Sequence, residues 1–255
     1  MNPAEFANIA RCEERLWWFR GQRRILDELL RPFLPGRKIT NVLEAGCGTG
    51  YQSAQFASQH GWNTFPLDLD GEGLRYARAG GVERPCQADV THLPFPAAAF
   101  DAVISLDVLV HFPRGAEQAA LLELVRVLRP GGLFVLRVSA LDILRSRHSM
   151  FAQERQRFTR RKLTAVVSRT GIRVLRCTYA NSLLFPVALC KFRLWEPLTN
   201  QPPASGVALV PGWLDSLLYY PLHIEAQLLR SGVNLPLGQS LLLIGEKPGA
   251  APEQG

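Results

Sequence analysis

Three glycines follow a carboxylate in the stretch LEAGCGTG, which runs from Leu43 to Gly50. An apolar segment precedes this stretch and a helix-like segment follows it. Such a turn directs backbone N–H groups toward a ligand, and glycine leaves no Cβ to block the ligand's approach. The spacing is G-x-G-x-G, and Tyr51 stands where the dinucleotide fingerprint G-x-G-x-x-G requires its third glycine. The stretch therefore indicates a cofactor site and disfavours a nicotinamide dinucleotide as the cofactor.

Short apolar runs alternate with longer helical segments from residue 41 onward. This alternation predicts an α/β protein with a Rossmann-like, doubly wound and mostly parallel sheet of seven strands. The expected strands cover residues 41–46, 63–68, 85–89, 100–107, 133–140, 172–180 and 239–247, and the expected helices cover 51–60, 72–80, 115–128 and 163–169. The glycine stretch then lies at the carboxyl edge of the sheet, where open α/β sheets bind their ligands.

At 255 residues, with 47% hydrophobic and 20% charged residues, the chain is expected to form one large domain with a sizeable core. We expect an N-terminal helical lid over residues 1–38, a cofactor-binding core over 39–140, substrate-side segments with a helical insertion over 141–238, and the last strand at 239–247. Within the insertion, a helix at 214–230 is predicted to cover the edge of the sheet. The tail from 248 to 255 is predicted to be disordered.

The formal net charge is +7, with 25 Arg and 4 Lys against 22 acidic residues, which favours an anionic partner. The densest basic run lies between Arg145 and Arg176 and holds ten basic residues and one acid. This run is compatible with a solvated face, or with an anionic acceptor, a carrier or a membrane surface as its partner. It carries few aromatic residues and no recognition module, so a nucleic-acid partner is not expected.

The five cysteines are scattered and include no C-x-x-C pair, so the sequence predicts neither a disulfide framework nor a metal site.

The N-terminus has acids and arginines in place of the apolar run of a signal peptide, and a cytoplasmic location is expected. The apolar stretch between Val207 and Ile224 is interrupted by Pro211, Asp215 and Pro221. A membrane crossing is therefore not expected, whereas peripheral contact with a membrane remains open.

The segment VLEAGCGTG resembles the first motif of the class I S-adenosylmethionine-dependent methyltransferases. The segments PLDLD, CQADVTHLPF, FDAVISLDVLVHF and RVLRPGG are similar to later motifs of that family, in the same order and at matching distances, over roughly residues 39–140. The N-terminal segment EERLWWFRGQRRIL is similar to a bacterial, small-molecule subgroup whose first helix often reads E-x-x-H-W-W-F-R, although Leu16 replaces the histidine. The resemblance implies S-adenosyl-L-methionine as the cofactor.

The resemblance gives a role to each acid that follows a strand. Asp68 is expected to bind the ribose hydroxyls. Asp89, with Val90 beside it, is expected to bind the adenine edge. Both roles are possible because carboxylates accept hydrogen bonds from hydroxyls and amines. Glu44 and the glycine loop are expected beside the methionine portion, whose ammonium needs an acceptor. Asp70 is interpreted as the N-cap of the next helix. The expected cofactor-binding residues are Glu44, Gly46, Cys47, Gly48, Gly50, Asp68, Leu69, Asp89, Val90 and Leu106.

Two residues after the fourth strand are candidates for catalysis. His111 lies at the carboxyl edge, where an imidazole can accept a proton from the methyl acceptor; alternatively, it lines the cofactor pocket or caps a loop. Asp107 is the second candidate, and its alternative role is to cap the turn before His111. Cys47 is interpreted as a packing residue of the glycine loop and not as a nucleophile.

The sequence thus predicts methyl transfer from S-adenosylmethionine to an oxygen, nitrogen or carbon of a small or lipid-like acceptor. A cyclisation or decarboxylation that uses the same cofactor is excluded by no residue, and a nicotinamide-dependent oxidoreductase is the less favoured alternative. The acceptor, the use of a general base and the oligomeric state stay open, because the acceptor side of the chain carries no recognisable pattern.

Overall fold

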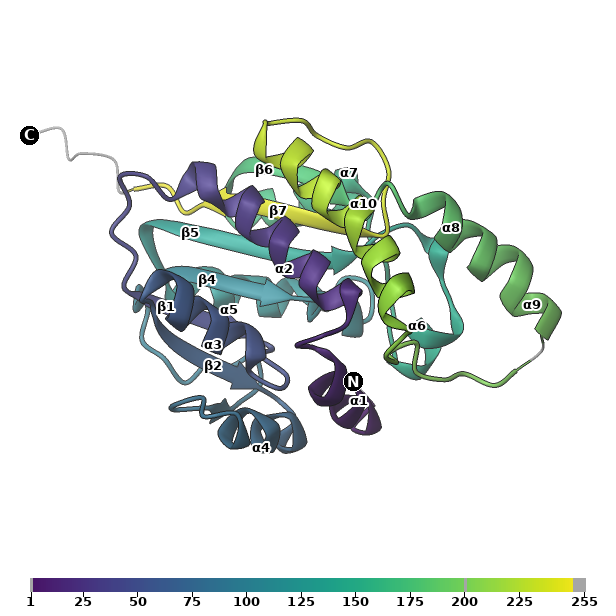
Figure 1. The fold of residues 1–255 in the computed structure, drawn as a ribbon. Coiled ribbons are helices and arrows are strands. Elements are labelled where there is room, and N and C mark those ends of the chain that lie inside the picture. The colour runs from purple at the N-terminus through teal and green to yellow at the C-terminus, as the bar shows by residue number, and fades with distance from the viewer. Residues whose placement is uncertain (1, 200, 250–255) are drawn as a thin grey trace, which may run out of the picture.

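One sheet of seven strands forms the centre of the computed structural model, which describes residues 2–199 and 201–249 (Figure 1). Across the sheet the strand order is β3-β2-β1-β4-β5-β7-β6, and β7 alone runs antiparallel to its neighbours among the described residues. The Rossmann-like, mostly parallel sheet that the sequence predicts is confirmed. The strands are β1 (Asn41–Ala45), β2 (Asn63–Asp68), β3 (Cys86–Gln87), β4 (Phe100–Leu106), β5 (Leu128–Ser139), β6 (Arg173–Ala180) and β7 (Ser240–Glu246).

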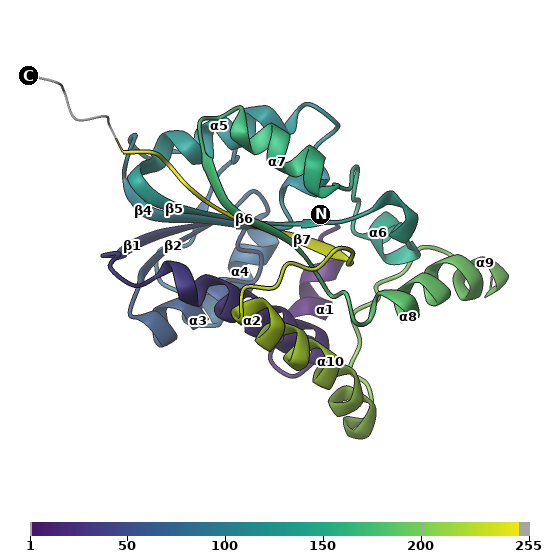
Figure 2. The same ribbon diagram turned by 90° about the horizontal axis from the view of Figure 1, so that it is seen from above.

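Helices cover both faces of this sheet (Figure 2). One face carries α2 (Trp17–Leu30), α3 (Tyr51–His60) and α10 (Gly212–Arg230), and the other carries α5 (Glu117–Val127) and α7 (Arg160–Ser168). The strands β4 and β7 are buried along nearly their whole length because both of their faces are covered. The helix α4 (Gly71–Ala79) packs near β2 and β3.

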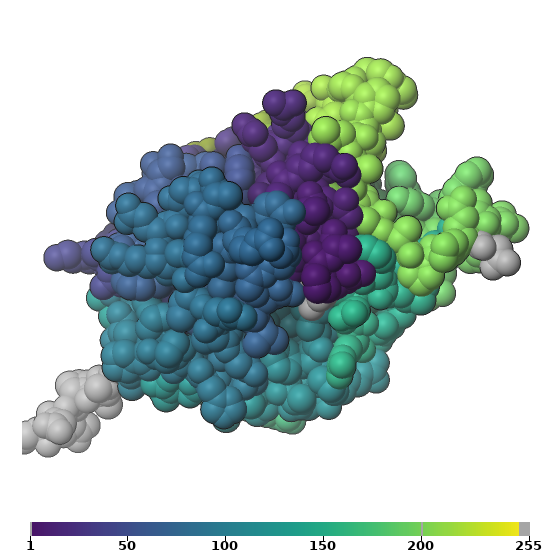
Figure 3. Space-filling view, turned by 90° about the horizontal axis from the view of Figure 1, so that it is seen from below, coloured from purple at the N-terminus to yellow at the C-terminus, as the bar shows by residue number. Residues whose placement is uncertain are grey.

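The carboxyl edge of the sheet is the side that the arrowheads of β4 and β5 reach in Figure 1. Three segments that lie far apart in the sequence meet there: α1 (Ala4–Cys12), α6 (Arg147–Phe151) and the loop 201–211. In the space-filling view of Figure 3, the purple N-terminal segment lies between the blue part of the chain and the green part. The edge on which the sequence places the cofactor site is therefore covered by the N-terminal helix.

The helices α2 and α10 lie side by side and run in the same direction. Leu16, at the N-cap position of α2, offers no side-chain acceptor, and the Asp215 carboxylate supplies one by accepting a hydrogen bond from the Trp17 N–H at 2.7 Å. At the other end of the pair, Arg230 lies 3.6 Å from the buried Glu28. The insertion is thus fastened to the N-terminal segment at both ends of the helix pair.

The insertion departs from the sequence prediction in two ways. Its main helix α10 packs along α2 through the buried Leu222, and it meets the edge strand β6 only near its C-terminal end, where Arg176 donates to the Leu229 carbonyl. A second helical arm, formed by α8 (Phe185–Cys190), a π-helical turn (Lys191–Trp195) and α9 (Glu196–Thr199), is absent from the prediction. Its proline- and aromatic-rich sequence gives no clear helical period.

Two short-range features also shifted the predicted boundaries. The helix α7 begins three residues earlier than predicted because the Thr159 side chain accepts a hydrogen bond from the Lys162 N–H. The helix α6 was not predicted, and a capping box between Ser146 and Ser149 starts it. The predicted disordered tail from 248 to 255 falls mostly outside the described residues. Within the described part of the chain, no helix combines the length and the apolar character needed to cross a membrane.

Gly21 is expected to be essential for the contact between α2 and α10. A Cβ at this position would lie 2.2 Å from Leu222 Cδ1 and 2.8 Å from Leu222 Cβ. Gly→Ala in a helix normally stabilises by about 1 kcal/mol, but overpacking costs about 1–3 kcal/mol, so Gly21→Ala should lower the free energy of unfolding. Urea unfolding measures this free energy. The control is Gly212→Ala in α10, where nothing lies within 4 Å of the added Cβ. A stabilised Gly21→Ala protein would contradict this packing.

Candidate cofactor and catalytic site

The glycine loop joins β1 to α3 and is anchored on β2. The N–H groups of Gly46 and Cys47 both donate to the Leu67 carbonyl, at 2.7 and 2.9 Å. Gly46, Gly48 and Gly50 have φ of +85°, +56° and +74°, in the left-handed region that favours glycine. The backbone therefore needs glycine at all three positions.

The surroundings of the three glycines differ. A Cβ at Gly46 would lie 2.0 Å from Val108 Cγ2, and one at Gly50 would lie 2.7 Å from Ala77 Cβ, so packing inside the protein excludes side chains at both positions. A Cβ at Gly48 would have as its nearest neighbour, among the described residues outside the loop, a ring carbon of Phe6 at 3.8 Å. Gly48 is thus the glycine at which the protein itself leaves room for a Cβ, with the Phe6 ring of α1 in contact beside it.

Asp68 ends β2 and holds two backbone segments with one carboxylate. Its Oδ2 accepts from the Gly48 N–H at 2.7 Å, and its Oδ1 accepts from the Asp70 N–H at 2.9 Å. Burial raises the pKa of Asp68, and these two hydrogen bonds oppose that rise. Each oxygen keeps a further lone pair, so the carboxylate can also accept from ligand hydroxyls. Asp70 accepts from the Glu72 N–H at 2.9 Å, which confirms it as the N-cap of α4.

Asp89 lies after β3, next to the end of β2. The Ala88 N–H donates to the Asp68 carbonyl at 3.1 Å, which joins the two strand ends. Asp89 is exposed, and its Oδ1 accepts from both the N–H and the hydroxyl of Thr91 at 2.8 Å, so its Oδ2 faces away from these bonds. Leu69 is 66% exposed, whereas Val90 is buried. Asp68, Leu69 and Asp89 thus form a polar and apolar rim that suits a nucleoside.

Glu44 is buried beneath the glycine loop. Burial raises its pKa to about 8, the Ser53 hydroxyl that donates to it opposes the rise, and the nearby Asp68 adds to it. Burial also raises the pKa of the Cys47 thiol, which keeps it protonated and agrees with its interpretation as a packing residue. Leu106 is half-buried at the end of β4. The predicted cofactor-binding residues therefore gather around the carboxyl ends of β1, β2, β3 and β4.

His111 ends a short 3-10 turn (Leu109–His111) after β4. Its Nδ1 lies 3.3 Å from the Gln153 carbonyl oxygen, so Nδ1–H is the donor and Nε2 carries the free lone pair. Burial lowers the pKa of His111, and the Gln153 contact opposes this. The imidazole is therefore neutral at neutral pH, with Nε2 ready to accept a proton.

Asp107 is bound in an ion pair. Its Oδ2 accepts from Arg137 Nε at 2.8 Å and from Nη2 of the same guanidinium at 2.7 Å. Its backbone N–H also donates to the Arg137 carbonyl at 2.8 Å, and its φ is +60°. Both contacts go to Oδ2, and this ion pair together with the backbone bond favours a positioning role at the ends of β4 and β5.

The sequence predicts an N-terminal lid, but it does not identify which residues of α1 reach the site. Phe6 is buried against Gly48 and Gly73, and the Thr49 hydroxyl donates to Glu13 just after this helix. Glu5, also buried, accepts from the Ser205 hydroxyl at 2.9 Å. These partners lie up to 200 residues apart, and no local pattern in the sequence links them.

The basic run between 145 and 176 is largely engaged within the protein. Arg157 pairs with Glu154 at 2.9 Å, and Arg176 donates to the carbonyls of Leu229 and Val233. These contacts account for much of the run, which weakens its use as evidence for an anionic acceptor. The members that make side-chain hydrogen bonds are Arg145, Arg147, Arg157, Arg160, Lys162, Arg173 and Arg176.

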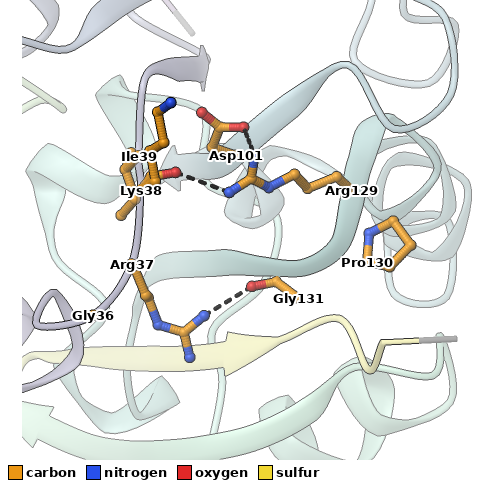
Figure 4. A pocket seen from close by; sticks show the side chains of 8 residues that line it. All are labelled: Gly36, Arg37, Lys38, Ile39, Asp101, Arg129, Pro130 and Gly131. Atoms are coloured by element: carbon orange, nitrogen blue, oxygen red, sulfur yellow. Dashed lines mark hydrogen bonds and ion pairs between the residues drawn. The ribbon is translucent and has the colours of Figure 1, made fainter. Parts of the chain in front are cut away.

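A cavity of about 290 Å³ lies at the amino ends of β1 and β4, away from these residues (Figure 4). Arg129 pairs there with Asp101 at 2.5 Å and donates to the Lys38 carbonyl at 2.8 Å, while Arg37 donates to the Gly131 carbonyl at 2.8 Å. Because both guanidinium groups are already paired, we assign no ligand to this cavity.

A fold of this kind, with its acids at the carboxyl ends of β2 and β3, defines a nucleoside-binding α/β enzyme. Residues 43–136 match the methyltransferase domain family. The chain is 37% identical over 124 residues to malonyl-[acyl-carrier protein] O-methyltransferase of Enterobacter lignolyticus, which covers 48% of each protein. It is 38% identical over 99 residues to fatty-acid O-methyltransferase of Mycolicibacterium smegmatis, which covers 37% of this chain and 35% of that relative. The matched segment thus spans about half or less of these curated relatives.

Solved structures share the fold at low sequence identity. A methyltransferase of Haloferax volcanii in complex with the activator Trm112 superposes with a TM-score of 0.61 and 20% identity over 98% of this chain and 95% of that chain. The [4+2]-cyclase SpnF superposes with a TM-score of 0.57 and 18% identity, over 89% of this chain and 82% of SpnF. Residues 43–136 thus carry the methyltransferase domain, which takes S-adenosyl-L-methionine as its cofactor, and the chain around them shares the fold of these solved structures.

Gly48→Ala should weaken cofactor binding, because the added methyl group occupies the space that a ligand needs beside the loop. The control is Gly61→Ala, which has a similar φ of +66° and nothing within 4 Å of its Cβ. Both variants should lose about 1–2 kcal/mol of stability from left-handed backbone strain. Calorimetry with S-adenosylmethionine should show weaker binding for Gly48→Ala alone. Equal affinities of the two variants would mean that the loop is only a turn.

The raised pKa of Glu44 predicts a pH-dependent stability. The folded pKa of about 8 lies above the ordinary value of 4.5, so the neutral form stabilises the fold, and this contribution is lost as pH rises from about 5 to about 8. Glu44→Gln removes the titration and should gain stability relative to the native protein by up to about 1.4 kcal/mol per pH unit across that window. Above it the difference should level off. Urea unfolding at several pH values tests this, and parallel curves would refute it.

Proposed function

We propose that the protein transfers a methyl group from S-adenosylmethionine to a nucleophilic atom of a lipid-like acceptor, with His111 as the group that takes the acceptor's proton. The observation that carries the proposal is the orientation of this imidazole. The Gln153 carbonyl holds Nδ1–H at 3.3 Å, which leaves Nε2 as the proton acceptor at the carboxyl edge of the sheet.

The residues around the glycine loop fit the cofactor. Asp68 would accept from the ribose hydroxyls and Asp89 from the adenine amine, while the glycine loop around Gly48 would lie beside the methionine portion. When bound, the cofactor supplies an electrophilic methyl group on a sulfonium. The protein's own task is then to align the acceptor and to receive its proton. Glu44 lies beneath the loop, where a nearby positive charge would favour its ionised form.

The surroundings of His111 suit a neutral base. Burial lowers the pKa of the imidazole, while the acids Glu154 and Asp107 raise it and limit the shift. These acids are themselves held, Glu154 by the Ser139 hydroxyl at 2.8 Å and Asp107 by Arg137. Because Arg137 and Arg157 also pair with these acids, the acids would offset only part of the cost of a protonated His111.

The N-terminal segment is proposed as the lid of this site. Phe6 covers Gly48, and Glu5 links α1 to Ser205 of the insertion. Closing the edge in this way would exclude water from the reacting groups. On this view residues 1–38 form the lid, 39–140 bind the cofactor and 141–238 bind the acceptor, all within one domain.

Two observations support a lipid-like acceptor. The relatives named above act on a malonyl acyl-carrier protein and on fatty acids, as their names state. In this chain, the segment proposed to face the acceptor carries several exposed apolar side chains, among them Trp195, Leu198 and Trp213. A cyclisation with the same cofactor is the second candidate, because SpnF shows that this fold also serves a cyclase.

His111→Ala should lower kcat by about 10²–10⁴, the usual cost of losing a general base, while the dissociation constant for S-adenosylmethionine stays within a few-fold. Turnover is measured as the S-adenosylhomocysteine formed from S-adenosylmethionine in the presence of each member of a panel of fatty acids, acyl thioesters and isoprenoid alcohols. A cyclase would release none with any acceptor. Since the pKa of His111 is lowered, activity should persist below the ordinary histidine pKa and fall only at more acidic pH.

The matched control is His223→Ala, which removes a histidine of α10 that packs between Tyr219 and Tyr220. This variant should keep its turnover. If His223→Ala loses turnover and His111→Ala keeps it, the base lies in the insertion. If His111→Ala instead abolishes cofactor binding, the histidine belongs to the cofactor pocket.

A further inference from the structure

Apolar side chains form an exposed stripe along α10. They recur at intervals of three or four residues, the period of one helical face. The opposite face of the helix packs on α2 through Leu222. The stripe therefore has no partner among the described residues. Its members are Trp213, Leu217, Tyr220, Ile224 and Leu228, which are between 37% and 71% exposed.

The second arm of the insertion, from α8 to α9, carries a similar surface. Trp195 is 66% and Leu198 82% exposed, values that are costly for large apolar side chains in water. Beside this arm lies a cavity of about 330 Å³, lined mainly by apolar atoms of Ile143, Leu189 and Leu194. We call the exposed residues Val187, Leu194, Trp195, Leu198, Trp213, Leu217, Tyr220, Ile224 and Leu228 the apolar face.

Among the charges that the insertion itself carries, the exposed ones beside the apolar face are cations, and the nearby Asp142 is paired with Arg114 and Arg145. All three carboxylates between 181 and 237 are engaged with the protein. Glu196 accepts from the Arg147 N–H at 2.9 Å, Asp215 pairs with Arg20 at 3.3 Å, and Glu225 accepts from the N–H groups of residues 181, 182 and 183. Lys191 and Arg193, on the arm itself, are exposed. The apolar face is therefore flanked by exposed cations, with its own acids turned inward.

Both arms start at the carboxyl edge of the sheet. The helix α10 begins beside the N-terminus of α2, where Asp215 accepts from the Trp17 N–H, and α9 is tied to α6 through Glu196. Figure 1 shows α6, α8 and α9 beyond the carboxyl ends of β4 and β5. A surface bound to the apolar face would thus lie next to the edge that holds His111 and Asp68.

We propose that the apolar face docks on an anionic lipid bilayer. Tryptophan and tyrosine are enriched at the membrane interface. Lys191 and Arg193 have no carboxylate partner on the apolar face, and anionic headgroups would supply one. A second copy of the chain would bring the same cations without exposed acids to pair with them, so self-association fits the charges less well. Docking is a binding property and does not depend on the identity of the methyl acceptor.

Vesicle flotation of the full chain tests the proposal. The protein should bind vesicles of phosphatidylcholine with about 30% phosphatidylglycerol, and should bind pure phosphatidylcholine vesicles more weakly. Leu217→Ser and the double variant Trp195→Ser/Trp213→Ser should weaken this binding, the double variant by about ten-fold or more. Lys191→Ser should weaken it roughly five-fold on anionic vesicles only. The matched control is Leu122→Ser on α5, where the leucine is 52% exposed on the opposite face of the sheet.

Several results would overturn docking. One is the absence of binding to anionic vesicles, and another is an equal loss of vesicle binding for Leu217→Ser and Leu122→Ser. A third is a dimer, seen in light scattering, that the double variant Trp195→Ser/Trp213→Ser dissociates while the native protein binds no lipid. Binding of S-adenosylmethionine, measured on the same variants, should be unchanged. This measurement separates a failure of docking from a failure of the proposed methyl transfer, because a protein that docks without binding the cofactor would contradict only the latter.

Discussion

The site depends on the two hydrogen bonds that the Asp68 carboxylate accepts. One comes from Gly48 in the loop after β1, and the other from Asp70 in the turn after β2. A buried carboxylate loses its water, and backbone N–H groups are the donors that replace it here. The same two bonds fix the glycine loop and the start of α4 relative to each other. The ligand-facing groups are thus held in position by the residue that is expected to bind the ribose.

The electrostatics of the site follow from burial. Glu44 lies deep under the loop with a raised pKa, His111 is neutral because burial lowers its pKa, and Asp107 is neutralised by Arg137. A site of this kind carries little unpaired charge of its own. A cationic cofactor would then meet carboxylates that are already positioned, and its charge would compensate for their poor solvation.

The cover of the site is built from two distant parts of the chain. The N-terminal helix reaches the insertion through Glu5 and Ser205, and α2 reaches it through Asp215. The insertion in turn carries the apolar face, so a surface bound there would contact the same segments that close the carboxyl edge. Access to the site and contact with a lipid surface are therefore expected to involve the same helices.

The sequence by itself determined the parts of this protein that depend on local order. The alternation of strands and helices, the glycine turn after the first strand and the N-cap at Asp70 are all set by neighbours within a few residues, and the structure contains them. The arm formed by α8 and α9 escaped prediction because its helical period is weak and nothing nearby in the sequence fixes it. Only the tertiary structure decided that Val108 and Ala77 exclude side chains at Gly46 and Gly50, and that the Gln153 carbonyl sets the tautomer of His111. Those contacts join residues that are brought together by the packing of the whole sheet, and a pattern read along the chain holds no information about them.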